Sequence, residues 1–246
     1  MTNKLLSIIV PVYNEAKTLS EIINKLLILK LPANYQKEII ILDDCSKDHS
    51  EAIANSLVKL HPEISLYKNA ANLGKSQTVK HGIMHSKGDF VIIQDADLEY
   101  FPSEIPLLLQ LALDQQLDVV YGNRFGKKNT VIYWKNYWGN KMISLFSNLF
   151  TYPRLKIYIP DMEVCYKLIS GEIARTLAPQ IVSQTNFGFE PEITAKLSRY
   201  LQNEKHLHFA ITPISYQPRT VAEGKHMKAF RDGFKAVGEI IRFNLL

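Results

Sequence analysis

Two aspartates with one residue between them are the feature of this sequence with the clearest chemical meaning. Asp95 and Asp97 flank Ala96 and follow the apolar run 90–93, so they stand at the carboxyl end of an expected buried strand. Hard cations such as Mg²⁺ or Mn²⁺ are bound by one or two carboxylates together with substrate phosphates. Because ligands of open α/β sheets bind outside the carboxyl ends of strands, the pair indicates a metal-bridged phosphate ligand. A solvated acidic turn is the plainer alternative.

Three further polar segments are expected at the same edge of the sheet. Segments 11–15, 43–48 and 72–75 lie in loops that follow or connect the predicted strands and helices, and such loops converge on one crevice in a parallel sheet. Tyr13 offers an aromatic face, and Lys75 offers a compact cation for phosphate. Hydrogen-bond acceptors are supplied by Glu15 and Asp43. These groups suit a nucleoside diphosphate, although each also has an ordinary use in turns and helix caps.

Apolar runs alternating with helical patterns predict the elements that must position these loops. Near-continuous apolar strands alternating with helices are typical of a parallel sheet covered on both faces. The expected strands are 5–10, 38–42, 64–67, 89–93, 163–169, 207–216 and one that begins at 119. The expected helices are 15–29, 48–60, 76–85, 103–115, 130–149, 191–201 and 226–243. The predicted class is therefore α/β.

Composition narrows the class of protein. With 246 residues, 46% of them hydrophobic and 22% charged, the chain can bury a sizeable core. Cys45 and Cys165 give neither a disulfide framework nor zinc spacing. Residues 5–10 are too short for a secretory leader, and no run reaches the roughly 18 apolar residues of a membrane span. We therefore expect a cytoplasmic location, or peripheral attachment to the cytosolic face of a membrane.

Basic and aromatic side chains are concentrated in residues 124–156, where there is no acid. Both tryptophans, Trp134 and Trp138, lie there, and the chain carries a net charge of +5. Such a mixture suits a membrane surface or a phosphorylated ligand, or single-stranded nucleic acid. An amphipathic helix with a solvated basic face is the plainer alternative. The expected helix 226–243 leaves two alternatives open, a membrane interface or packing on the protein itself.

Several motifs then follow one another along nearly the whole chain. They are SIIVPVYNE at 7–15, LDDCSKD at 42–48, NLGK at 72–75, QDADLE at 94–99, GNR at 122–124, DMEVCYK at 161–167, GFEPEIT at 188–194, YQPRT at 216–220 and EGK at 223–225. In this order they resemble the family 2 inverting glycosyltransferases of GT-A fold, and within them the dolichyl-phosphate mannose/glucose synthase group. The resemblance implies a Rossmann-like, mostly parallel sheet with helices on both faces over residues 1–217. An acceptor loop and a C-terminal amphipathic helix, 218–246, would belong to the same unit.

The resemblance also implies which residues bind the donor and a metal. A nucleoside-diphosphate sugar, with GDP and UDP both open, would be bound by Pro11, Val12, Tyr13, Glu15, Asp43, Lys75, Asp95, Ala96 and Asp97. Mg²⁺ or Mn²⁺ would be held by Asp95, Asp97 and, two residues further on, Glu99.

The implied catalytic and acceptor roles lie in the second half of the chain and in Asp97. The catalytic residues would be Asp161, Asp97 and Arg124. The acceptor phosphate would be bound by Lys135, Arg219 and Lys225. Asp161 matches the general base of the family, yet a phosphate monoester is mostly ionised at pH 7 and needs little deprotonation. We therefore expect Asp161 to position or tune other groups more than it abstracts a proton.

The implied reaction is metal-dependent transfer of a hexose, with inversion, to a dolichyl or undecaprenyl phosphate at a membrane surface. A saccharide acceptor is the nearest alternative, and it would make Asp161 a true base. The chain departs from many relatives at 164–166, where Ser-Gly-Phe is common, and at Cys45, where Gly or Asn is common. Neither the donor, the lipid length nor the oligomeric state is predicted.

Three other classes of protein fit less well. Receiver-type regulators have about half this length and place the acidic pair after the first strand. A nucleic-acid-binding module would leave Asp95 and Asp97 without a role, so we expect no nucleic-acid partner. Sugar nucleotidyltransferases usually open with a glycine-rich loop, whereas 11–15 contains no glycine.

Overall fold

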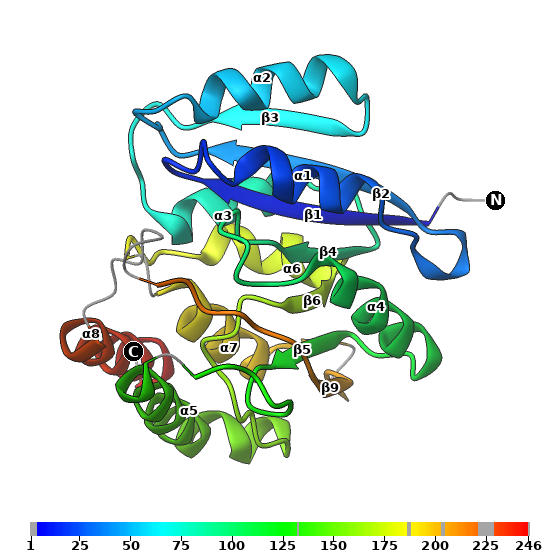
Figure 1. The fold of residues 1–246 in the computed structure, drawn as a ribbon. Helices are drawn as coiled ribbons and strands as arrows, with labels where there is room; N and C mark the ends of the chain where they lie inside the picture. Colours follow the sequence, from blue (N-terminus) through cyan, green and yellow to red (C-terminus); the bar gives the residue numbers. More distant parts are fainter. Residues whose placement is uncertain (1–3, 132, 186–187, 203–204, 221–228, 246) are drawn as a thin grey trace.

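A seven-stranded sheet with the order β3-β2-β1-β4-β6-β5-β9 runs through the centre of the molecule (Figure 1). The structure is a computed structural model that describes residues 4–131, 133–185, 188–202, 205–220 and 229–245. The strands of the sheet are β1 Leu5–Val12, β2 Gln36–Asp43, β3 Ile64–Lys68, β4 Phe90–Ile93, β5 Val119–Asn123, β6 Lys167–Ser170 and β9 Phe209–Pro213. A separate two-stranded ladder pairs β7, Leu201–Gln202, with β8, Lys205–His206.

The sheet is mostly parallel, as the apolar runs predict. β1 pairs in parallel with β2 and β4, β2 with β3, and β5 with β9. β6 is the exception, because it runs antiparallel to both β4 and β5. The strand predicted at 163–169 is shorter in the structure and begins only at Lys167. Residues 162–164 form a turn instead, since the carbonyl oxygens of Met162 and Val164 accept hydrogen bonds from the Lys167 ammonium.

Helices cover both faces of the sheet. In Figure 1, α1 (Leu19–Leu27) and α4 (Ile105–Asp114) lie in front of the strands, while α2 (Ser50–Leu60) packs over β2 and β3. The opposite face is covered by α3 (Lys75–His85), α6 (Gly171–Leu177) and α7 (Phe189–Arg199). Single-turn 3₁₀ helices are Pro32–Asn34, Pro102–Glu104 and Ala178–Gln180. The sequence did not reveal α6, which follows β6 without a loop.

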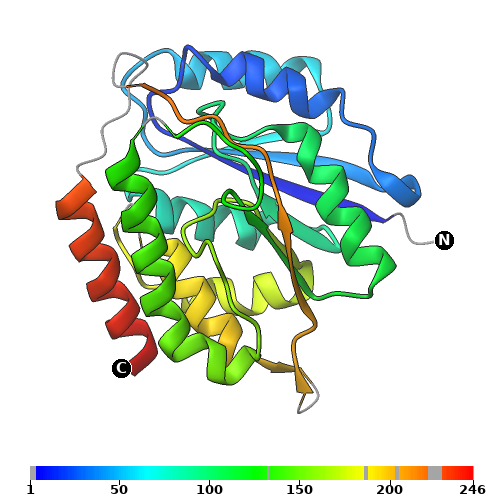
Figure 2. The ribbon, with the colours of Figure 1, turned by 60° about the horizontal axis from the view of Figure 1, so that its bottom comes forward.

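Two long helices form a further layer beside α7. The helices α5 (Trp134–Leu155) and α8 (Ala229–Leu245) lie side by side (Figure 2). The last helix packs on the protein through Ala236, Ile240 and Phe243, whereas Ile241, on the stripe that the sequence singled out, is 41% exposed, so a membrane interface stays the other alternative. Within the described ranges, no helix is long and apolar enough to traverse a bilayer.

The helix α5 buries small and polar side chains and exposes large apolar ones. Its buried residues are Ile143, Ser144, Ser147, Asn148, Thr151 and Leu155. Its exposed apolar residues are Trp134, Trp138, Met142, Leu145, Leu149 and Tyr152. Spacings of three and four place the second set on one stripe. This is the reverse of an ordinary amphipathic helix on a protein core, and it leaves a continuous apolar surface on the outside of the molecule.

Candidate active site

One cavity of about 410 Å³ lies at the carboxyl ends of β4, β5 and β9. Its walls come from the segment after β4, the segment after β5, the first turns of α5 and the segment after β9. These three strands point the same way, because β6 is antiparallel to both β4 and β5 and β9 is parallel to β5. The position agrees with the general rule for ligands of open α/β sheets.

Lys75 connects two acidic groups on one wall of the cavity. Its ammonium nitrogen lies 2.9 Å from Asp95 Oδ1 and 3.1 Å from Glu190 Oε1. Burial lowers the pKa of Lys75, but Asp95 and Glu190 together raise it well above its usual range. The lysine is placed by Asp44, whose carboxylate accepts hydrogen bonds from the backbone amides of the loop before α3, at 2.9 Å in the case of Gly74. The structure thus holds a permanent cation beside the first aspartate of the pair.

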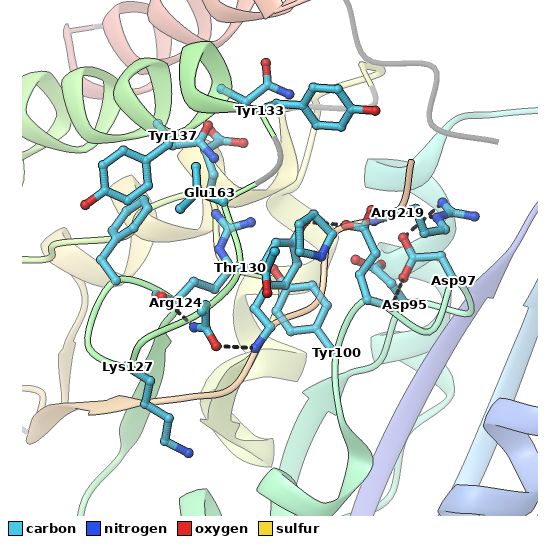
Figure 3. A pocket seen from close by; sticks show the side chains of 18 of the residues that line it. Asp95, Asp97, Tyr100, Arg124, Lys127, Thr130, Tyr133, Tyr137, Glu163 and Arg219 are labelled. Atoms are coloured by element: carbon cyan, nitrogen blue, oxygen red, sulfur yellow. Dashed lines mark hydrogen bonds and ion pairs between the residues drawn. The ribbon is translucent and has the colours of Figure 1, made fainter. Parts of the chain in front are cut away.

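Arg219 lies against the second aspartate (Figure 3). Its Nη2 is 3.1 Å from Asp97 Oδ2, its Nη1 is 3.4 Å from Glu15 Oε1, and its Nε is 3.7 Å from Glu99 Oε1. Burial, followed by the charges of Asp95 and Glu99, raises the pKa of Asp97 to about 7, although Arg219 lowers it. The negative charge here is therefore only partly balanced, which is the condition a bound divalent cation would relieve.

Glu99 holds the segment that carries Arg219. One of its carboxylate oxygens accepts a hydrogen bond from the Tyr216 hydroxyl, and the other accepts one from the Arg219 backbone amide at 2.8 Å. The chain turns back at Leu98, whose φ of 62° is unusual for a bulky residue. Both oxygens of Glu99 are thus engaged, and its role as a metal ligand stays a prediction.

The aspartate pair suits a divalent cation that takes its remaining ligands from a substrate, rather than one enclosed by protein ligands alone. Among the described residues, no three His, Cys, Asp or Glu side chains are arranged to hold a metal ion. Asp95 and Asp97 are both partly exposed to the cavity, with 20% and 17% of their side-chain surface accessible. Mg²⁺ needs only one or two carboxylates when substrate phosphates complete its shell, and this pair offers that donor set.

Asp161 and Arg124 form a second, closed ion pair beside the same cavity, with Arg124 in its wall and Asp161 behind it. Arg124 Nε and Nη2 each lie 2.7 Å from a different Asp161 oxygen, and the Arg124 amide donates to Oδ2 at 3.0 Å. Asp161 is fully buried, whereas Arg124 reaches the cavity, with its guanidinium 5.1 Å from the Tyr216 ring centre. Both oxygens of this buried carboxylate are thus engaged by Arg124, and the expectation that Asp161 positions other groups more than it abstracts a proton stays a prediction.

The loop before Asp161 is fixed by the buried polar face of α5. Asn148 donates to the carbonyl of Ile159 at 2.7 Å and accepts from its amide at 2.8 Å. The Ser144 hydroxyl accepts from the Met162 amide at 2.9 Å. The small polar residues of α5 therefore position the Asp161–Arg124 pair.

The residues predicted to bind the nucleoside lie outside the wall of this cavity. Tyr13 is 42% exposed, whereas Val12, Asp43 and Ala96 are buried. Pro11 is the last residue but one of β1. Glu15 is joined to the cavity through Arg219. The nearby Cys45 has a φ of 60°, a left-handed conformation that Gly and Asn adopt more readily than Cys.

The predicted acceptor cations are not all brought to the cavity. Arg219 lines it, whereas Lys135 is exposed on the first turn of α5 and is absent from the wall. Lys225 lies outside the described residues. Sequence reasoning gave no role to Glu163 and Glu190, which both line the cavity. The signal that could have found them was an acid between apolar neighbours, Met162 and Val164 for Glu163 and Phe189 and Pro191 for Glu190.

Comparison with known sequences bears on this site. The model of the family described as "Glycosyl transferase family 2" matches residues 7–177. An undecaprenyl-phosphate 4-deoxy-4-formamido-L-arabinose transferase from Pseudomonas savastanoi is 34% identical over 144 residues, which are 58% of this chain and 41% of that protein. A dolichol-phosphate mannosyltransferase from Pyrococcus furiosus is 32% identical over 138 residues, 56% of this chain and 38% of that protein. The similarity thus spans about two fifths of the length of these relatives.

Comparison with solved structures confirms the fold. A glucosyl-3-phosphoglycerate synthase from Mycobacterium tuberculosis, in complex with Mn²⁺, UDP and glucosyl-3-phosphoglycerate, superposes with a TM-score of 0.71 at 15% identity. The superposition covers 98% of this chain and 80% of that one. A complex of the same enzyme with Mg²⁺ and UDP gives a TM-score of 0.69. The mostly parallel GT-A architecture expected from the sequence is therefore confirmed.

Proposed function

The chain belongs to glycosyl transferase family 2, and from this premise we propose that it transfers a hexose from a nucleoside diphosphate to a polyprenyl phosphate. One observation carries the proposal. A single cavity joins the Asp95–Asp97 pair and Lys75, which suit a sugar diphosphate, to Arg124 and Arg219, which suit a second phosphate. Two relatives support the proposal, because their names state transfer to undecaprenyl or dolichol phosphate.

Asp95 and Asp97 would hold Mg²⁺ or Mn²⁺ between the protein and the diphosphate of the donor. When bound, the cation neutralises charge on the leaving diphosphate. Lys75 contributes a second positive charge from the protein, already oriented by Asp95 and Glu190. Arg219 contacts only Oδ2 of Asp97, so this carboxylate could bind the cation through its other oxygen or exchange Arg219 for it. GDP and UDP donors are both compatible with this arrangement.

The acceptor phosphate would bind between Arg124 and Arg219, whose positive charges offset its repulsion by the donor diphosphate. Lys135 and Lys225 are further candidates for this role. A phosphate oxygen attacks the anomeric carbon on the face opposite the leaving diphosphate, so the configuration inverts. Because this oxygen is already ionised at neutral pH, Asp161 is required to hold Arg124 and not to remove a proton.

The exposed stripe of α5 fits attachment to the cytosolic face of a membrane. Trp134, Met142 and Leu149 are 66%, 69% and 64% exposed, and continuous exposed apolar surface of this kind marks an interaction site. The stripe begins at Trp134, beside Tyr133 and Tyr137, which line the cavity. A lipid whose tail stays in the bilayer would therefore present its phosphate at the cavity mouth, and the surrounding basic residues favour anionic lipids.

The test is a transfer assay with purified protein, Mn²⁺ or Mg²⁺, and either GDP-mannose or UDP-glucose. We expect turnover of one donor to require undecaprenyl or dolichyl phosphate and to stop when EDTA is added. Free dolichol, which lacks the phosphate, is the matched control and should give no product. Turnover with a saccharide acceptor but not with the lipid phosphates would assign the other family 2 reaction instead.

A further inference from the structure

Glu163 has a place in the cavity that the proposed reaction does not yet use. Its carboxylate lines the wall near Arg124 and Tyr137, across the cavity from Asp97 and Arg219 (Figure 3). Its Oε1 is buried and has no hydrogen-bond partner among the described residues. An unsatisfied buried oxygen costs about 1–3 kcal/mol, and such groups require an explanation.

The backbone around Glu163 is held in place by a buried lysine. The Lys167 ammonium donates to the carbonyl oxygens of Met162, at 2.9 Å, and Val164, the residues on either side of Glu163. Lys167 is fully buried, and its nitrogen lies 4.7 Å from the Tyr121 ring centre. With both flanking peptides fixed, the turn has little freedom to withdraw the Glu163 carboxyl from the cavity.

The charge around Glu163 identifies which part of the reactants lies beside it. Glu163 and Glu190 line the same cavity, and burial, followed by the charge of Glu190, raises the pKa of Glu163 to about 8. An oxygen without a partner needs a hydrogen-bond donor, whereas the donor diphosphate and the acceptor phosphate are ionised at pH 7 and offer only acceptors. The transferred hexose is the one reacting group without charge, and its hydroxyls are hydrogen-bond donors that Oε1 lacks.

We infer that Glu163 is a specificity-determining residue that hydrogen-bonds a hydroxyl group of the transferred hexose. This inference rests on the proposed function. Lys167 is the positioning residue for this contact, because it fixes the turn from which Glu163 extends. The sugar would lie between the Asp95–Asp97 pair, which binds its diphosphate, and the Arg124 side of the cavity, from which the acceptor attacks.

A cycle of substrate and side-chain deletions tests the contact. The kcat/KM of wild type, Glu163→Met and Glu163→Gln is measured with the accepted donor, GDP-mannose or UDP-glucose, and with its 2-, 3-, 4- and 6-deoxy analogues. In wild type we expect one deoxy analogue to lose about 10- to 100-fold relative to the parent sugar. Glu163→Met should lose a similar factor on the parent sugar but nothing further on that analogue. Glu163→Gln, which keeps hydrogen-bonding groups, should recover most of the loss.

The inference would be overturned if the free-energy losses from the Glu163→Met change and from the deoxy substitution simply added. It would also be overturned if Glu163→Met and Glu163→Gln lost the same factor in kcat/KM. Glu172→Met, an exposed glutamate on α6, is the matched control and should behave as wild type. Circular dichroism establishes that each variant is folded, and if Glu163→Met is not, Glu163→Gln completes the cycle with a smaller but nonzero coupling. If wild type transfers sugar from neither donor, the proposed function fails and this contact with it. Transfer with additive losses removes only the contact.

Discussion

Two aspartate–arginine pairs lie in the same cavity and differ in how firmly they are bound. Asp161 and Arg124 share two contacts of 2.7 Å, and Asp161 has no accessible surface. Asp97 and Arg219 share one contact of 3.1 Å, and both side chains are partly exposed. Arg219 is also divided among three carboxylates, and its Nε is buried without a hydrogen-bond partner. The first pair is part of the framework, and the second is an exchangeable contact.

The comparison distinguishes residues that are needed for activity from residues that are needed for the stability of the fold. An exchangeable pair can release its aspartate to a cation at little cost to folding, since a partly exposed ion pair contributes about 0–1 kcal/mol. A closed buried pair cannot lose one member without leaving an uncompensated charge, which costs about 3–5 kcal/mol. The following predictions test this division, beginning with the largest expected effect.

Asp97→Asn should abolish activity while leaving the fold intact. We expect kcat/KM for transfer to fall by about 10³-fold or more, because the cation and the leaving diphosphate lose a ligand and its charge. The melting temperature should remain within a few degrees of wild type. Asp114→Asn, at an exposed position at the end of α4, is the control and should change neither quantity. Full activity of Asp97→Asn with Mn²⁺ would remove the aspartate pair from the mechanism.

Asp161→Asn should show the opposite pattern. The free energy of unfolding should fall by about 3 kcal/mol, since Arg124 remains buried without its counter-ion. At a temperature where the variant is folded, kcat should fall by no more than about tenfold, because no proton has to be abstracted. Urea denaturation and steady-state kinetics provide the two measurements. A kcat loss near 10⁴-fold in the folded variant would instead establish obligatory base catalysis.

Glu163→Gln should change the dependence of stability on pH. The unfolded carboxyl ionises near its usual value of 4.5, whereas the folded one ionises near 8. Folding therefore takes up a proton between these values, and the contribution of Glu163 to stability falls as the pH rises from 4.5 to 8. Relative to wild type, the variant should gain roughly 3 kcal/mol between pH 5 and pH 7.5. A stability difference that does not vary with pH, measured by urea denaturation, would contradict this.

Met142→Glu should weaken attachment to membranes without affecting the cavity. An acid in the exposed stripe of α5 removes apolar contact and repels anionic lipid, which together should lower liposome binding by about tenfold. Leu60→Glu, an equally exposed apolar position on α2, is the matched control. Flotation with anionic liposomes measures the effect. Equal flotation of both variants would exclude the stripe as the attachment surface.

Sequence patterns were most informative where the type of side chain and the backbone conformation indicate the same element. The apolar run before Asp95 determined both the strand and the position of the aspartates at its end, and the structure brings Arg124 to the same cavity, paired with Asp161. The direction of β6 was not predictable, because a strand of four residues with only Leu168 and Ile169 apolar has the same composition in either orientation. Nor was the turn at Glu163, which depends on a lysine that binds two carbonyl groups of its own chain.

Other assignments required three-dimensional information for a different reason. Lys135 is one residue from Trp134 and Asn136, yet its side chain is exposed while Asn136 lines the cavity. Adjacent side chains of a helix point in directions about 100° apart. An error of one residue in the predicted position is therefore enough to exchange a side chain that faces the cavity for one that faces solvent. The sequence placed that start at residue 130, and the structure has it at Trp134.

The two faces of α5 have a mechanical consequence. Ser144 and Asn148 hold the loop that leads to Asp161, while Met142 and Leu149 face outward on the same rigid cylinder. A rotation or sliding of the helix would therefore carry the loop with it. A force applied to the outer face would thus reach Arg124 through the Asp161 carboxylate, over a few turns of helix.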